Sequence, residues 1–451
     1  MKKIFALLLV ALMLFSLTAC AQTADPAKPA AETTQETQSE KPDTVAADNT
    51  DDGEVVEIVW AMQGAANETE GWNAVVAAAN EQLKDENIKI VVQNIPTADW
   101  DEYYQKITAQ IIGGDCPDIG RIAESLMPIA IEKNQVMDLT DKINAEIDRS
   151  QYFDTVFNNA GAKDGKIYGL PSGVYQKLVY FNKDIFDNAG IAYPSSDWDH
   201  PTTLQEYVEI AKQLSSGEGA NRNYGFYCET DIFMVGCFAG ENLYSANNTY
   251  AITDAHREVY RYLDQMLNVD KSMPTPVDTQ IMGGFDMFCA GKLAMVCDGT
   301  WWQQTARGIT DFNVGIAAAP SLDGSANAVS FIDNYVVWKD SKHPEEAWKA
   351  LKAIFSEACA NELAKTGTGG VPVNRNTLAN YSATLIGENF DETSQASFMQ
   401  SMDHTWAMPY NASCNEVQSQ TNALLQPWMV GNKSLDDALV ELDATLADLT
   451  K

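Results

Sequence analysis

From about residue 55 onward, short apolar runs alternate with amphipathic stretches, and this pattern predicts a series of strands and helices. Residues 55–60 (V-V-E-I-V-W) and 88–92 (I-K-I-V-V) have the composition of strands. Residues 72–83 and 99–112 have the apolar spacing of helices, and two glycines then end the second helix. This order predicts an α/β fold with a mostly parallel sheet that has helices on both faces.

The same signals predict elements along the rest of the chain. The run at 293–297 (L-A-M-V-C) contains no charged residue, which predicts a strand that is buried on both faces. Other strands are expected from about residue 119, at 167–170 with Pro171 as its stop, and at 179–183, 224–226, 312–320 and 335–338. Helices are expected at 125–133, 184–189, 203–214, 231–240, 254–268, 344–359 and 434–449.

Two adjacent tryptophans, Trp301 and Trp302, follow the 293–297 strand after an Asp-Gly turn. Open α/β sheets bind ligands at the carboxyl ends of their strands, so this is a position for a ligand contact. Neighbouring side chains in an extended segment point in opposite directions. One ring can therefore pack inward while the other faces a cleft; the alternative is that both rings fill the core.

The amino terminus has the pattern of an export signal. Two lysines precede an apolar run at residues 4–17, which is too short to span a membrane, and Thr18-Ala19-Cys20 follow. Residues 17–20 (L-T-A-C) resemble the lipobox of bacterial lipoproteins, which implies that Cys20 is lipidated. We therefore expect a lipid-anchored protein on the extracellular face of the cytoplasmic membrane. The alternative is an ordinary signal peptide and a freely secreted protein.

Residues 21–54 contain no aromatic residue and are composed mainly of Ala, Thr, Glu, Gln, Asp, Lys, Ser and Pro. Such a segment cannot bury enough apolar surface to fold, so it is expected to be a disordered tether. The whole chain of 451 residues has 63 acidic and 30 basic residues and a net charge of -33. This charge repels phosphate backbones and argues against a nucleic-acid partner.

The reactive residue types do not form a recognisable catalytic or metal motif. The four histidines are far apart without an H-E-x-x-H pattern, and no G-x-S-x-G or phosphate loop occurs. We therefore expect no enzyme activity, no catalytic residue, no metal and no cofactor. We interpret the seven cysteines besides Cys20 mostly as small buried residues, although Cys228/Cys237 and Cys289/Cys297 are possible disulfide pairs.

Several short stretches, taken in their order along the chain, resemble those of a known protein family. The stretches are 104–118, 164–171 (D-G-K-I-Y-G-L-P), 180–183 (Y-F-N-K), 288–295 (F-C-A-G-K-L-A-M), 344–348 (P-E-E-A-W) and 370–374 (G-V-P-V-N). None is specific alone, but their order across residues 55–450 resembles the extracellular solute-binding proteins of ABC importers, of the type of maltose-binding protein.

The resemblance implies a two-lobed fold of the type II periplasmic-binding-protein class. Lobe 1 would contain residues 55–169 and 321–370, and lobe 2 residues 173–316 and 375–451, with crossover segments between them. A ligand would bind in the cleft and close it by a hinge motion. The partners would be a small solute and ABC permease subunits in the membrane, and the protein itself is expected to be a monomer.

A sugar site needs aromatic plates for C–H faces, together with carboxylates and amides for hydroxyl groups. The resemblance places Trp301 at the ring-stacking position of the family and Tyr175 at a frequent contact position. The other candidates lie at strand and loop ends: Trp302, Gln63, Glu124, Asp298, Asn334 and Trp406. Each polar candidate has a structural alternative, because Asp298 can cap its turn, Glu124 can begin a helix and Asn334 can support a loop.

The function predicted from the sequence is therefore a receptor that delivers a mono- or oligosaccharide to an ABC importer. A receptor for a polyamine or a peptide is the first alternative, because the acidic balance permits a cationic ligand. An exported glycoside hydrolase is a weaker alternative. Its acid pairs, Asp101/Glu102 and Glu345/Glu346, fall at predicted helix starts, where acids stabilise the helix dipole.

Overall fold

A computed structural model describes residues 55–63, 69–97, 99–153, 156–157, 161–243, 249–367, 369–381, 390–407, 411 and 413–449. The predicted export signal, Cys20 and the predicted tether lie outside these residues. Within the described residues, no helix is both long and apolar enough to cross a membrane.

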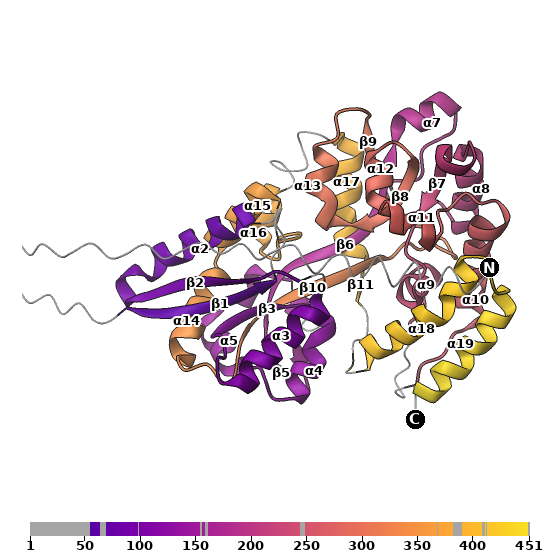
Figure 1. The fold of residues 1–451 in the computed structure, drawn as a ribbon. Helices are drawn as coiled ribbons and strands as arrows, with labels where there is room; N and C mark the ends of the chain where they lie inside the picture. Colours follow the sequence, from indigo (N-terminus) through magenta and orange to yellow (C-terminus); the bar gives the residue numbers. More distant parts are fainter. Residues whose placement is uncertain are drawn as a thin grey trace, which may run out of the picture. The chain divides into compact units, whose positions relative to one another are not determined.

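One mixed sheet organises the described chain, and its strands follow the order β2-β1-β3-β10-β6-β8-β7 (Figure 1). The prediction of a mostly parallel sheet is wrong. Strands β1, β2 and β3 pair in parallel, but β10 runs antiparallel to β3 and β6, and β6 runs antiparallel to β8 and β9. The strands are β1 (Val56–Gln63), β2 (Ile88–Ile95), β3 (Ile119–Ile122), β6 (Leu170–Asn182), β7 (Tyr224–Tyr227), β8 (Leu293–Gly299), β9 (Val314–Ala317), β10 (Ala328–Val337) and β11 (Thr405–Ala407), with β4 (Ala162–Lys163) and β5 (Lys166–Ile167) as a separate pair.

Helices cover the sheet, and α2 packs against β2, α14 and α15. The helices are α2 (Thr69–Leu83), α3 (Trp100–Gly113), α4 (Met127–Glu132), α5 (Thr140–Glu146), α7 (Lys183–Ala189), α8 (Leu204–Leu214), α9 (Ile232–Ala239), α10 (Asp254–Asp264), α11 (Pro276–Ile281), α12 (Gly284–Cys289), α13 (Gln303–Arg307), α14 (Pro344–Ile354), α15 (Glu357–Thr366), α16 (Arg375–Tyr381), α17 (Glu392–Gln400), α18 (Cys414–Met429) and α19 (Leu435–Leu449).

The two long strands β6 and β10 join the first group of strands to the second. The first half of β6 pairs with β10, and its second half pairs with β8 and β9. All thirteen residues of β6 are buried, since the strand has neighbours on both edges and packed side chains on both faces. In Figure 1, β6 and β10 lie between the β1–β3 group and β8.

The prediction that Pro171 stops a strand is wrong, because β6 runs through it to Asn182. Proline cannot donate a ladder hydrogen bond and is tolerated at strand starts and at bulges. Pro171 is the second residue of β6, and it faces the register shift between Asp333 and Asn334 on β10. The shift accommodates the missing donor.

The predicted helix at 344–359 is also corrected, because the structure contains two helices, α14 and α15, in this region. Ser356 has an extended backbone, and its hydroxyl accepts a hydrogen bond from the backbone N–H of Cys359. This contact is an N-cap, which starts a new helix. The apolar spacing continues across the break, so the pattern alone joins the two helices.

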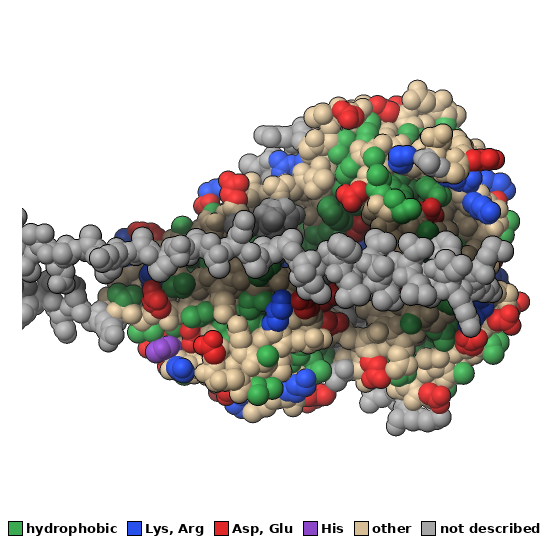
Figure 2. All heavy atoms as spheres, viewed as in Figure 1, with side chains coloured by type: hydrophobic (Ala, Val, Ile, Leu, Met, Phe, Trp, Pro, Cys, Tyr) green, Lys and Arg blue, Asp and Glu red, His purple; other side chains and the backbone are tan. Residues whose placement is uncertain are grey.

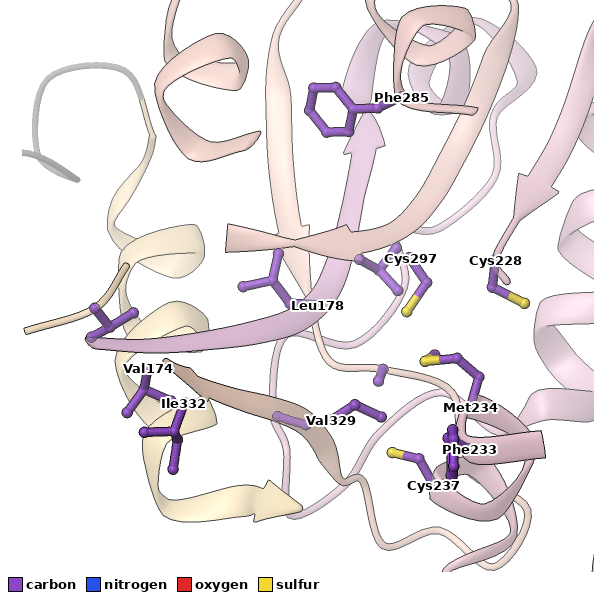
Figure 3. Packing of buried hydrophobic residues seen from close by; sticks show 14 of the residues in the cluster. Val174, Leu178, Cys228, Phe233, Met234, Cys237, Phe285, Cys297, Val329 and Ile332 are labelled. Carbon is purple, nitrogen blue, oxygen red and sulfur yellow. The ribbon is translucent and has the colours of Figure 1, made fainter. Parts of the chain in front are cut away.

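Apolar side chains from several elements meet in the core around β6 (Figure 3). Val174 and Leu178 on β6, Ile332 on β10 and Phe285 on α12 all belong to one buried cluster. All seven cysteines between positions 116 and 414 are described and free, so neither possible disulfide forms. Cysteines 228, 237, 297, 359 and 414 are buried, which fits their interpretation as small apolar residues.

Charged residues are dispersed over the face that Figure 2 shows. Figure 2 shows Asp and Glu side chains among Lys and Arg side chains on the visible face. Residues from Gly53 onward form one compact unit. This result does not divide the folded part into lobes, so the predicted lobe limits and crossover segments stay a prediction.

Candidate ligand-binding site

A pocket of about 430 Å³ lies where the end of β1 and the segments after β3, β7 and β8 meet strands β6 and β10. Small-molecule sites commonly have volumes of about 300–1,000 Å³. The location agrees with the rule that α/β sheets bind ligands beyond the carboxyl ends of strands. The lining residues are Gln63, Trp100, Arg121, Ala123, Glu124, Ser125, Tyr175, Lys177, Glu229, Asp231, Phe233, Met234, Trp301, Val329, Phe331, Asp333 and Gln418.

Three aromatic rings form one wall of the pocket. The Trp301 ring centroid lies 6.3 Å from that of Tyr175 and 5.8 Å from that of Phe331. Trp301 remains 36% exposed, so part of its surface is available to a ligand. A Cβ atom on Gly299 would lie 2.3 Å from the Trp301 ring. Glycine at this position therefore lets the ring fold back over the end of β8.

Trp302 lies outside this wall and packs inward. Its ring stacks on Phe285 with a centroid distance of 4.7 Å and an interplanar angle of 6°. The two adjacent tryptophans thus have different surroundings. One lines the pocket and the other packs against the core, which is the arrangement that the sequence predicts.

A buried arginine donates hydrogen bonds to two polar groups that line the pocket. One terminal nitrogen of Arg121 on β3 donates to the Asp333 carboxylate on β10 at 2.6 Å and to the Tyr175 hydroxyl on β6 at 2.7 Å. The side chains of Arg121 and Asp333 are only 5% and 8% exposed. The guanidinium also lies 4.8 Å from the Trp72 ring and 5.3 Å from the Trp100 ring. These contacts hold groups from three strands in a single arrangement.

A lysine close to the aromatic wall provides a second charged pair. Lys177 on β6 pairs with Glu229, and its ammonium lies 5.9 Å from the Trp301 ring and 5.8 Å from the Phe331 ring. Burial opposes the charge on Lys177, but Glu229, Asp231 and Asp298 together raise its pKa above the usual value. Lys177 lowers the pKa of Glu229 in turn. Both groups are therefore charged at neutral pH.

Two further carboxylates reach the pocket from helix starts. Glu124 begins a short 3₁₀ turn, Glu124–Leu126, and is 6% exposed. Asp231 caps α9 and accepts hydrogen bonds from the backbone N–H groups of Phe233 at 2.9 Å and Met234 at 3.3 Å. Burial raises the pKa of Asp231, and the neighbouring charge of Glu229 adds to this shift. Phe233 and Met234, with Val329 on β10, supply an apolar part of the lining (Figure 3).

The comparisons with known proteins identify the family. Residues 65–358 match the family of bacterial extracellular solute-binding proteins. The chain belongs to this family. A putative binding protein of Brucella abortus is 24% identical over 293 residues, which cover 63% of this chain and 69% of that protein. The galactooligosaccharide-binding protein of Bacillus subtilis is 23% identical over 402 residues, which cover 85% of this chain and 86% of that protein.

A solved structure has the same fold as this chain. An ABC substrate-binding protein of Listeria monocytogenes, in complex with cycloalternan, matches this solute-binding protein with a TM-score of 0.75 and 23% sequence identity. The match covers 87% of this chain and 98% of that chain. The predicted type II periplasmic-binding-protein fold is confirmed.

Four of the eight ligand-contact candidates predicted for this solute-binding protein come together in the pocket: Gln63, Glu124, Tyr175 and Trp301. The other four described candidates, Trp302, Asp298, Asn334 and Trp406, do not line it. Asn334 is fully buried, and its amide donates to the Ile332 carbonyl at 3.1 Å. Trp406 pairs across β11 and β10 with Val329.

Asp298 has a structural contact of its own, since its carboxylate accepts from the Gly299 N–H at 2.7 Å. Burial raises the pKa of Asp298 from 3.8 to about 6, although Lys177 opposes the shift. The residue influences the pocket through this charge interaction rather than by lining it. Asp118 has structural contacts, because its carboxylate accepts hydrogen bonds from the Val59 N–H and from the Ser341 hydroxyl.

Sequence reasoning missed the charged residues that lie inside strands. Arg121, Lys177 and Asp333 are the charged residues of the buried strands β3, β6 and β10. A charge in a buried strand needs a partner, and this requirement is the signal that could have identified them. Among the residues that the structure describes, no group of three or more His, Cys, Asp or Glu side chains is placed to hold a metal ion.

Proposed function

We propose that this protein is a lipid-anchored extracellular receptor that binds a carbohydrate in the 430 Å³ pocket and delivers it unchanged to an ABC importer. The observation that carries the proposal is the pocket lining, which combines the Trp301 wall with carboxylates held by Arg121 and Lys177.

This lining matches the surface of a sugar. The C–H faces of a pyranose pack on aromatic rings, and its hydroxyl groups donate to fixed carboxylates and amides. Preorganised acceptors favour binding because their side-chain entropy is lost on folding and not on ligand binding. The names of relatives agree with this proposal, since one binds galactooligosaccharides and another is in complex with cycloalternan.

Closure of the cleft is supported by a contact between distant segments. The amide of Asn415 on α18 donates to the Asp101 carboxylate on α3 at 2.9 Å, although 314 residues separate them. Trp100 and Gln418, which lie close to this pair in sequence, both line the pocket. The contact is placed to hold the mouth of the pocket closed around a ligand, and the permease would recognise the closed, loaded form.

Anchoring would follow from lipidation of Cys20, with residues 21–54 as the tether to the folded part. Acyl chains contribute about 0.8 kcal/mol of membrane affinity per buried CH₂ group. Fractionation of cells that express the wild type or Cys20→Ser tests this proposal. The wild type should be in the membrane fraction, and the variant should not be membrane-bound; equal membrane association of both would contradict lipidation.

A polyamine receptor is the second candidate, because the pocket lining has four carboxylates (Glu124, Glu229, Asp231 and Asp333) and two cations. Two of these carboxylates are paired with Arg121 and Lys177. An acidic cleft without a stacking ring would favour a polyamine, whereas this pocket has Trp301 with Tyr175 and Phe331 beside it. The aromatic wall favours a sugar.

Thermal unfolding of the chain that lacks residues 1–20 tests the function. The chain is screened against oligosaccharides, polyamines and peptides, and a ligand at 100 times its Kd adds about 2.7 kcal/mol of stability. We expect a rise in Tm with a sugar that is recovered chemically unchanged. Consumption of the sugar would identify an enzyme, and a rise only with polyamines or peptides would identify another class of receptor.

A further inference from the structure

A second pocket of about 460 Å³ adjoins the first. It is formed by the segment after β7, the region from α10 to α11 and one face of α18. We call the pocket at Trp301 the first compartment and this pocket the second compartment.

Three polar residues are common to both compartments: Glu229, Asp231 and Gln418. They therefore form the boundary between the compartments rather than the end of a closed site. Glu229 is held by Lys177, and Asp231 is held by the start of α9, so their carboxylates have fixed positions. A ligand that crosses this boundary would meet preorganised acceptors for its hydroxyl groups.

The second compartment has side chains that suit a further sugar unit. Gln418, Asn422 and Gln426 are spaced by four residues on α18, so their amides lie along one face of the helix. Tyr227 and the prolines 274 and 276 supply flat apolar surface. Each compartment alone has a volume in the range of about 300–1,000 Å³ that is typical of a complete small-molecule site.

We propose that the two compartments form one bipartite site and that the ligand is an oligosaccharide which extends from the Trp301 wall, past Glu229 and Gln418, into the second compartment. This inference rests on the proposed function. It resolves the choice between a mono- and an oligosaccharide in favour of the oligosaccharide.

Affinity as a function of chain length tests the proposal. Calorimetric titration of the mature chain uses malto-, cello-, galacto-, manno- and arabino-oligosaccharides of two to six units. In the series that binds, we expect the affinity to rise at least about tenfold between the dimer and the longer members, which corresponds to about 1.4 kcal/mol. Equal affinity across that series would contradict the bipartite site, but it would not contradict the proposed receptor function.

A variant that fills only the second compartment makes the test specific. Ala423 is exposed on α18, so Ala423→Trp places a ring in the second compartment without displacing core side chains. It should remove the gain for longer sugars and leave dimer binding unchanged. Gln420→Trp, at an exposed position of α18 that lines neither compartment, is the matched control and should retain the gain.

Two further outcomes are decisive. If Ala423→Trp loses its helical circular dichroism, Asn422→Ala replaces it and should weaken binding of the longer sugars only. Wild-type affinity for long sugars in a folded second-compartment variant would overturn the proposal. The absence of binding in every series would instead overturn the carbohydrate function on which the inference rests.

Discussion

At the scale of single residues, the pocket depends on charges that support one another inside the fold. Lys177 is almost fully buried, and it stays charged because Glu229, Asp231 and Asp298 surround it with negative charge. Burial disfavours charge on a carboxyl group, and Asp298 has a pKa raised by burial to about 6. The buried charges around the pocket therefore lower the folding stability by an amount that depends on pH.

Replacement of Asp298 by asparagine should remove part of this pH dependence. Burial raises the pKa of Asp298 from 3.8 to about 6, so the folded state binds the proton more tightly than the unfolded state. The contribution of this residue to stability is therefore present below about pH 4 and is lost as the pH rises through about 6. Relative to Asp298→Asn, the wild type should lose up to a few kcal/mol between these values.

Urea unfolding of both proteins at a series of pH values measures this difference. Titrating groups that do not interact with Asp298 contribute equally to both proteins, so their effects cancel in the comparison. The asparagine side chain of the Asp298→Asn variant retains an oxygen acceptor for the Gly299 N–H, which limits structural loss. A stability difference that does not change with pH would show that Asp298 titrates normally in the fold.

The sequence predicted those pocket residues that lie at or just after strand ends, such as Gln63, Glu124 and Trp301, because strand ends can be recognised from apolar patterns. It did not predict Arg121 and Asp333. Their contact depends on the antiparallel pairing of β3 with β10, which places residues from distant segments beside each other. A pattern of local hydrophobicity does not contain that register.

At the scale of elements, β6 and β10 position both walls of the site. Tyr175 and Lys177 alternate along β6 with buried neighbours, and Phe331 and Asp333 lie on β10. The segment before α16 crosses β6 closely, since Val174 and Val371 exchange backbone hydrogen bonds at 3.0 and 2.7 Å. This crossing requires a residue without a side chain at Gly173.

Gly173→Ala should destabilise the fold. A Cβ atom at this position would lie 1.9 Å from the Gly369 carbonyl oxygen, so backbone must move. Overpacking of this kind costs about 1–3 kcal/mol or more. Gly113→Ala is the control, because a Cβ atom there has no described neighbour within 4 Å. Denaturant unfolding should show a large loss for the first variant and a change within about 1 kcal/mol for the second; similar values would contradict the close crossing.

Asn415→Ala should accelerate ligand release. The variant removes the hydrogen bond between α18 and α3, and an exposed hydrogen bond contributes about 1 kcal/mol or less, so a two- to fivefold faster dissociation rate is expected. Gln420→Ala removes a hydrogen bond to Glu416 within α18 and serves as the control. Stopped-flow measurement of ligand release decides this point: equal rates for both variants would exclude a role of Asn415 in holding the mouth closed.

Most elements could be predicted from apolar periodicity and turn residues, and the parallel β1–β3 arrangement followed from the strand-helix order. The errors have physical causes. The continuous β6 was divided at Pro171, because the register shift against β10 that accommodates this proline depends on a distant strand and leaves no local signal. The helices α14 and α15 were joined because their apolar spacing continues across the cap at Ser356.

At the scale of the whole molecule, the negative charge and the pocket have separate roles. On the face in Figure 2, Asp and Glu side chains are spread among Lys and Arg side chains, and a net negative charge favours solubility. The pocket combines aromatic rings with carboxylates, of which two are already paired with cations. Ligand choice should therefore depend on the lining residues and not on the net charge of the protein.

The central claim is that a carbohydrate binds against Trp301. Calorimetric titration of the best sugar from the thermal screen into wild type, Trp301→Ala and Trp302→Phe tests it most directly. Loss of the Trp301 ring should weaken binding at least about tenfold, or 1.4 kcal/mol, whereas Trp302→Phe, which retains a ring against Phe285, should bind as the wild type does. Unchanged affinity in a folded Trp301→Ala protein would contradict the site and the account built on it.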